Sequence, residues 1–322
     1  MTEAPFDPAY ALFHAVAYQR QMAALKAGTR FAYYTTAETA VQVLKNREIW
    51  LRMPTCMNDA SEVQHGRDAI IDVWGGDEGT RLAEVFDRVY PGISDELTKK
   101  LDAESATELL AQTFIACLSE HAVTPEEDRY GRLSMWRAYG GPSGIALILK
   151  GDPLFADADG LSVYSSPVEY LDASAFKQQI REFVDRMNAN QDFLRSLGRD
   201  NCLWWLYQTI TMAMLCVKHP AFVEEREWRI FHSEREPSTI LRREIECIRG
   251  VAQPVIKLPL DDNPDGSKSG RAISDILDRV IVGPTDFPLA TASAFVDLLE
   301  KLGVPDAGNK VIISGVPLRS NS

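Results

Sequence analysis

The sequence lacks the residue patterns of disulfide-linked and zinc-binding proteins. It has only five cysteines, far apart and odd in number, so neither a disulfide framework nor a CxxC zinc pattern is present. Its five histidines show no HxH or HxxxH ligand spacing, so we expect no zinc site. Sparse cysteines fit a reducing compartment, and we expect a cytoplasmic protein.

Long apolar runs and an excess of basic residues are also missing. No stretch approaches the roughly 18 to 20 apolar residues of a membrane span, and the first residues lack the basic and apolar regions of a signal peptide. Lys and Arg number 34 against 46 Asp and Glu, which gives a net charge of −12. We therefore expect no membrane segment and no broad basic surface for nucleic acid.

What is present is the composition of a soluble globular protein, with 45% hydrophobic and 25% charged residues. A chain of 322 residues can bury a substantial core without disulfides or metals. There is no internal repeat, low-complexity tract or clear linker. The sequence therefore predicts a single α+β domain over residues 1–322, with a bent or split central mixed sheet. We expect an N-terminal helix within residues 1–29 and helical insertions at residues 60–111 and 171–217.

Strands are predicted where β-branched and aromatic residues cluster or form short apolar runs. They cover residues 30–36, 48–53, 113–119, 144–149, 161–170, 251–258, 280–282 and 311–313. Thr36 is predicted to cap a helix that buries Ala40, Val43 and Leu44. Another short helix is predicted over residues 133–139.

The most informative stretch runs from Lys218 to His232. If residues 223–231 are extended, Glu225, Glu227 and Arg229 line one face, while Trp228 and Ile230 point to the other and anchor in the core. The two carboxylates would lie about 7 Å apart, from the rise of roughly 3.3 Å per residue. Such a face could present an acid or base to a ligand, or it could be a structural ladder of ion pairs.

Several segments, taken together and in order, resemble the bacterial domain-of-unknown-function family 2971. They are Tyr33–Thr36, Asn46, Ile49–Leu51, Asn58–Asp59 with Glu62, Cys117–Glu120, Met135–Gly140, Gly144–Leu147, Glu225–Arg229 and Ile281–Pro284. The family pattern usually has Pro-Phe or Pro-Met after Asn-Asp, whereas this chain has Ala60-Ser61. The resemblance implies no particular activity, because the family name states none.

The chain is also similar, more distantly, to ADP-ribosyltransferases with reduced motifs. The similarity implies Tyr34 with Thr35 on the first strand, then Ser119 or Tyr139, and finally Glu225 and Glu227. Cleavage of the nicotinamide bond of NAD develops positive charge on the ribose, which a carboxylate stabilises. The similarity thus implies NAD as the substrate, Glu227 as the catalytic carboxylate and Glu225 as its partner. Tyr34 and Tyr139 would be the ring contacts of a toxin or phage-defence effector whose acceptor is unknown.

Other interpretations of the same residues stay open. Trp136 and Tyr139 lie three apart on a short helix, where they could stack on a planar ring or pack in the core. Asn58 and Asp59 could bind ligand or cap the following helix. Alternatively, Asp59, Glu62, Glu225 and Glu227 could supply oxygen ligands to Mg²⁺ for phosphodiester cleavage, with Lys218 near the phosphate. Arg229 could contact substrate or hold a carboxylate in one rotamer. The non-enzymatic alternative is a binding or interaction protein in which these residues form a structural lattice.

Overall fold

The computed structural model of the chain describes residues 7–57, 60–103, 110–155, 161–248 and 250–317. The chain forms two compact units, distinguished by which parts of the backbone lie close together in space. Unit 1 comprises Met1–Arg20, Met53–Thr113 and Ser166–Val223, and unit 2 comprises Gln21–Arg52, Phe114–Ser165 and Glu224–Ser322. The segments predicted as helical insertions fall in unit 1, whereas the single-domain organisation stays a prediction.

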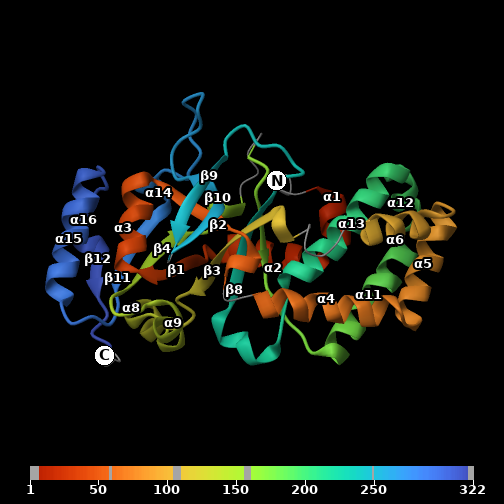
Figure 1. The fold of residues 1–322 in the computed structure, drawn as a ribbon, viewed down its shortest axis with the longest axis horizontal. Coiled ribbons are helices and arrows are strands. Elements are labelled where there is room, and N and C mark those ends of the chain that lie inside the picture. Colours follow the sequence, from red (N-terminus) through yellow and green to blue (C-terminus); the bar gives the residue numbers. More distant parts are fainter. Residues whose placement is uncertain (1–6, 58–59, 104–109, 156–160, 249, 318–322) are drawn as a thin grey trace. The chain divides into compact units, whose positions relative to one another are not determined.

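Unit 2 is organised on a ten-stranded mixed sheet (Figure 1). The main path runs β12-β11-β4-β1-β3-β2-β10-β9, and β8 pairs with β3 and β5 off this path. These strands are β1 (Arg30–Thr36), β2 (Glu48–Arg52), β3 (Thr113–His121), β4 (Gly144–Lys150), β5 (Tyr164–Pro167), β8 (Glu227–Ser233), β9 (Arg242–Ile248), β10 (Val251–Pro259), β11 (Leu277–Val282) and β12 (Val311–Ile313). The pair β11–β12 is parallel, whereas β4–β11 and β1–β4 are antiparallel. The predicted α+β fold with a large mixed sheet is confirmed, and this sheet is not closed.

Short helices flank this sheet. They are α3 (Ala37–Asn46), α8 (Pro125–Tyr130), α9 (Leu133–Tyr139), α10 (Asp152–Phe155), α14 (Ile273–Ile276), α15 (Pro288–Lys301) and α16 (Ala307–Lys310). The predicted cap of α3 is confirmed, because the Thr36 hydroxyl accepts a hydrogen bond from the amide of Thr39 at 3.3 Å. The predicted apolar stripe of Ala40, Val43 and Leu44 is buried. Helices α3 and α15 contact each other and the strands β4, β11 and β12.

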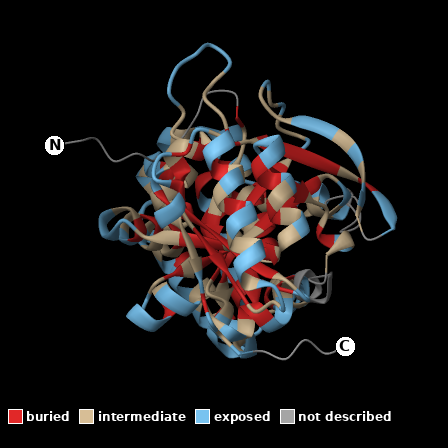
Figure 2. Ribbon diagram, turned by 90° about the vertical axis from the view of Figure 1, so that its left-hand side faces the viewer, coloured by how far each residue is buried: buried red, intermediate tan, exposed pale blue. Residues whose placement is uncertain are grey.

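Unit 1 is mainly helical. Its helices are α1 (Pro8–Phe13), the start of α2 (Ala15–Ala27), α4 (Ala60–Trp74), α5 (Asp77–Val89), α6 (Ile93–Ala103), α11 (Ala173–Ala189), α12 (Gln191–Leu197) and α13 (Arg199–Cys216). Two short parallel strands, β6 (Glu169–Tyr170) and β7 (Val217–Lys218), join them, as do the 3-10 turns η1 (Pro54–Cys56) and η2 (Pro220–Glu225). The helices of unit 1 bury one face in a shared apolar core, as amphipathic periodicity requires. In the core that these helices share, the rings of Trp205 (α13) and Phe13 (α1) are stacked with their centroids 5.8 Å apart. Figure 2 faces the helices that flank the large sheet and shows exposed residues on their outer faces and buried residues in the strands.

Three predicted elements differ in the structure. The first helix is interrupted at His14, whose φ of −118° and ψ of 46° are not helical. The predicted strand over residues 161–170 divides between two sheets, with β5 in the large sheet and β6 in the small one. The stretch predicted to be extended from Val223 begins instead as η2, and β8 starts only at Glu227.

Candidate functional site

The prediction that Glu225 and Glu227 share one face of a strand is wrong. Glu225 ends the 3-10 turn η2, and Arg226 follows with a φ of 43°, in the left-handed region that residues other than glycine seldom adopt. This turn breaks the period-two alternation on which the prediction depended. Glu227 is therefore the first residue of β8, without Glu225 beside it on the strand.

Glu227 and Arg229 lie two residues apart on β8 and form a buried ion pair. The Nε of Arg229 donates to the Oε1 of Glu227 at 2.6 Å, and the two side chains are 1% and 5% exposed. Trp228 and Ile230 on the other face are buried, as predicted. The indole of Trp228 packs at 5.1 Å from Phe31 and donates from Nε1 to Glu120 at 2.7 Å. This geometry is that of the structural ion-pair alternative.

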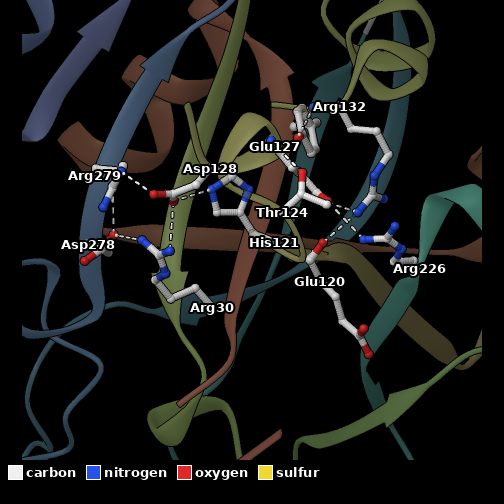
Figure 3. Close-up of polar contacts among 11 residues, drawn as sticks. Arg30, Glu120, His121, Thr124, Glu127, Asp128, Arg132, Arg226, Asp278 and Arg279 are labelled. Carbon is white, nitrogen blue, oxygen red and sulfur yellow. Dashed lines mark hydrogen bonds and ion pairs between the residues drawn. The ribbon is translucent and has the colours of Figure 1, made fainter. Parts of the chain in front are cut away.

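Arg132 contacts both the end of β3 and the turn before β8, and Figure 3 shows its contacts to Glu120 and Glu127. One terminal amino group donates to the Ser119 hydroxyl at 2.7 Å and to the carbonyls of Glu224 and Glu225 at 2.6 and 2.9 Å. The other donates to the carbonyl of Glu120 at 2.8 Å and to the carboxylate of Glu127 at 2.5 Å. Ser119 and Glu225 therefore do lie close together, through contacts to the Glu225 backbone rather than to its carboxylate.

The local sequence explains how Arg132 reaches this position. Thr124 caps α8 by accepting from the amide of Glu127 at 3.2 Å, and Gly131 ends the helix with a φ of 68°. Arg132 then stands at the N-terminal boundary of α9. Its partner Glu127 also accepts from Arg226 at 3.0 Å, so one buried carboxylate links α8 to the turn before β8. The sequence carried a cap signal for α8 but none for these distant partners.

Tyr34 is buried in the same region, and its hydroxyl accepts a hydrogen bond from the backbone amide of Arg132 at 2.8 Å. Burial raises the pKa of Tyr34 to about 12. Its ring meets the Trp136 indole edge to face at 4.8 Å. The neighbouring Thr35 is buried on β1, opposite Ile145 of β4.

Trp136 is 2% exposed, and its Nε1 donates to the carbonyl of Tyr130 at 2.8 Å. A Cβ placed on Gly131, Gly144 or Gly283 would lie 2.7, 2.9 or 2.7 Å from the indole, so these positions leave room only for glycine. Tyr139 is half-buried against the same cluster. Core packing of Trp136 and Tyr139 is thus favoured over a stacking platform for a ligand.

A second group of charged side chains forms a closed network of ion pairs beside this region (Figure 3). Arg30 contacts Asp128 and Asp278, each at 2.8 Å, and Arg279 contacts the same two carboxylates at 3.3 and 3.0 Å. His121 lies 3.4 Å from Asp128 with its side chain fully buried. Burial, followed by the nearby Arg30 cation, lowers the pKa of His121 to about 4. Two cations and two anions balance, which favours a structural role.

Asn58 and Asp59 lie outside the described residues, as does the side chain of Glu62. Within the described part of the chain, no group of three or more His, Cys, Asp or Glu residues could hold a metal ion. In that same part, no helix is both long and apolar enough to cross a membrane.

The sequence did not indicate a cavity of about 90 Å³ inside unit 1. It is bounded by the α1–α2 junction, β6, α11 and α13, and combines aromatic rings with polar groups: Phe13, Phe176, Phe183, Glu169, Gln179 and Arg186. On α11 these residues recur at helical spacing, so one face of the helix lines the cavity. The remaining walls come from segments distant in sequence, so no local signal could have located it.

Gln179 is the cavity-lining residue whose side chain is incompletely satisfied among the described residues. The Nε2 of Gln179 donates to Glu169 at 2.6 Å, while its buried Oε1 has no hydrogen-bond partner among the described residues. Burial raises the pKa of Glu169. A buried acceptor without a donor costs about 1 to 3 kcal/mol.

Comparison with known proteins gives a match to a family model. A family model described as "Protein of unknown function (DUF2971)" matches residues 135–230, a segment that includes Trp136, the Glu227–Arg229 pair and most of the cavity lining. No curated protein and no solved structure matches the chain. The resemblance to domain-of-unknown-function family 2971 is confirmed over residues 135–230.

Proposed function

We propose that this chain is a non-enzymatic binding protein whose small-molecule ligand occupies the cavity of unit 1. The observation that carries the proposal is the cavity itself, in which Phe13, Phe176 and Phe183 lie beside the polar side chains Glu169, Gln179 and Arg186. An apolar cavity with a few converging polar groups is the usual form of a small-ligand site. A volume of about 90 Å³ suits a molecule of few heavy atoms.

The arrangement in unit 2 supports binding over catalysis. A carboxylate that stabilises a developing ribose cation must face the reacting carbon with its charge available. Glu227 instead contacts Arg229 at 2.6 Å, and the hydroxyls of Tyr34 and Ser119 are hydrogen-bonded to Arg132. These contacts hold β1, β3 and β8 together, which is the role of a structural lattice.

A screen of small polar fragments by ligand-observed NMR tests the proposal. Ala213 lines the cavity on α13, so Ala213→Leu fills it, whereas Ala175→Leu enlarges an exposed position on α11. We expect some fragments to bind both the wild type and the Ala175→Leu control but not Ala213→Leu. Absence of any bound fragment, or equal binding to all three proteins, would overturn the proposal.

An NAD-dependent, ADP-ribosyltransferase-like activity is a second proposal. Its support is that Arg132 contacts Tyr34, Ser119 and the backbone of Glu225. The remote similarity to ADP-ribosyltransferases assigns these three positions to one site. The test is incubation with millimolar NAD, measuring melting temperature and nicotinamide release. If NAD neither stabilises the protein nor is consumed, and Glu227→Gln behaves like the wild type in both assays, this proposal is discarded.

A further inference from the structure

The large sheet of unit 2 ends at β9. Among the described strands, β9 pairs only with β10, so its other side is an edge of the sheet. Ile245, in the middle of β9, is 66% exposed. The edge of a sheet carries a row of N–H and C=O groups to which another strand can add.

The pairing with β10 shows which backbone groups of β9 point outward. The amide of Leu260, directly after β10, donates to the carbonyl of Arg47, directly before β2, at 2.7 Å. Backbone groups of a strand point to alternate sides, so even-numbered residues of β10 point to β2 and odd-numbered residues to β9. The odd-numbered residues lie opposite Glu244 and Glu246. By the same alternation, three residues of β9 carry N–H and C=O groups that point away from β10: Arg243, Ile245 and Cys247.

Among the described residues, no backbone hydrogen bond outside the β9–β10 pairing reaches these three residues. Pro254 fits the same pattern, because it lies opposite Ile245 and its missing N–H would point away from β9. The outward groups of β9 are therefore available to an added strand.

Charges of both signs follow one another along one face of β9. Arg242, Glu244 and Glu246 are two residues apart and share this face. Arg242 is exposed, and the two glutamates are half-buried. Lys257 of β10 contacts each of the glutamates at 2.6 Å. The face is therefore positive where β9 begins and negative further along the strand.

Antiparallel pairing with a second copy places these charges opposite one another. Hydrogen bonds form between outward-pointing residues, so the two-fold axis passes through a residue of β9 rather than between two residues. An axis at Glu244 puts Arg242 opposite Glu246 of the second copy, and the reverse pair forms on the other side. Glu244 then faces its own copy, with each carboxylate held by its own Lys257. An axis at Ile245 puts Glu244 opposite Glu246 twice, which like charges disfavour.

We propose that two copies of this chain pair through β9, antiparallel about a two-fold axis at Glu244, so that their large sheets become continuous. On the other face, Ile245 lies opposite Arg243 of the second copy, whose apolar stem covers it. A strand of unrelated sequence leaves the charges of β9 without matching ones, so the charge pattern selects a second copy. The assembly closes as a dimer, because each β9 occupies the edge of the other. This inference is independent of the cavity in unit 1.

Sedimentation equilibrium over a concentration series measures this pairing. We expect the wild type to dimerise and Arg242→Glu to weaken the dimer at least tenfold, because like charges then face each other at two places. Glu246→Arg should weaken it as much, with the opposite sign of charge. An equimolar mixture of these two variants should dimerise again with one chain of each, because each reversed charge then meets the other. Lys301→Glu makes the same charge reversal at an exposed position of α15 and, as the control, should leave the dimer unchanged.

A second variant tests the edge without altering its charges. The amide of Ile245 points outward, so Ile245→Pro removes a donor that pairing with a second copy needs and pairing with β10 does not use. We expect this variant to be folded by circular dichroism and monomeric by sedimentation.

Each outcome decides the inference in one direction. A wild type that stays monomeric up to millimolar concentration overturns it, and a strand of another protein is then the occupant to seek. A dimer that survives Ile245→Pro, or a mixture of folded charge variants that does not pair, also overturns it. Should a charge variant not fold, a folded, monomeric Ile245→Pro supports the inference. Should Ile245→Pro not fold, restored pairing in the mixture supports it.

Discussion

A substitution of Arg132 tests whether the buried polar contacts of unit 2 stabilise the fold. Its guanidinium donates to the carboxylate of Glu127, to the Ser119 hydroxyl and to three backbone carbonyls, and the side chain is only 11% exposed. Arg132→Met keeps the apolar stem of the side chain but removes every one of these donors. The variant therefore tests the polar contacts with little change in packing volume.

The expected cost follows from the partners that remain. Loss of one member of a buried ion pair costs about 3 to 5 kcal/mol when the other charge is left alone. Glu127 keeps Arg226 at 3.0 Å, which lowers this cost, while the Ser119 hydroxyl and the carbonyls lose charged donors worth about 1.5 to 3 kcal/mol each in a non-additive way. We expect Arg132→Met to lower the free energy of unfolding by about 3 kcal/mol in total.

Urea unfolding measures the total effect, and amide hydrogen exchange of β3 and of residues 220–226 measures it locally. Arg129 is an exposed arginine on α8, three residues away, so Arg129→Met is the matched control and should change stability by no more than about 0.5 kcal/mol. A loss below about 1 kcal/mol in Arg132→Met, or equal losses in both variants, would refute the reasoning.

Three further predictions concern other contacts of unit 2. Arg229→Leu should destabilise the protein by about 3 to 5 kcal/mol in urea unfolding, because Glu227 loses the cation that lies 2.6 Å away. Glu227→Leu/Arg229→Leu should recover part of this loss, because the carboxylate is removed together with the guanidinium; a double variant less stable than the single one would contradict it. Gly283→Ala should cost about 1 to 3 kcal/mol by clashing with the indole of Trp136, whereas Gly308→Ala, with open space around its Cβ, should be neutral in thermal unfolding; equal effects would rule out the close contact. His121 has a folded pKa of about 4, below its unfolded value of about 6.5, so its contribution of roughly 3 kcal/mol is present above pH 6.5 and is lost as pH falls through 4. His121→Gln should flatten the stability profile between these pH values, and an unchanged profile would show that another group dominates.

The local elements were predicted well where the signal lies within a few residues. The cap at Thr36 and the buried stripe of Ala40, Val43 and Leu44 follow from helical geometry alone. The buried Trp228 and Ile230 follow from strand alternation in the same way. Such patterns carry their own physical cause, so tertiary contacts do not have to be known.

The candidate site was predicted less well because its geometry depends on distant contacts and one unusual dihedral angle. Nothing in the stretch from Val223 to Phe231 indicated that Arg226 would adopt a φ of 43°, and this single residue separates Glu225 from the face of Glu227. Residues of that stretch find partners far back in the chain: Glu225 at Arg132 and Ser119, and Trp228 at Glu120. Pairing over such separations is decided by how the sheet is ordered.

By itself, the sequence determined the α+β class, the caps, the buried faces and the absence of disulfide and zinc patterns, because each of these depends on composition or on spacing of a few residues. Only the tertiary structure decided that Tyr34 and Ser119 are hydrogen-bonded to Arg132, that Glu227 is neutralised by Arg229, and that unit 1 holds a cavity. The physical reason is the same in each case. Whether a polar group is available to a ligand depends on which donors and acceptors the fold places beside it, and those come from distant parts of the chain.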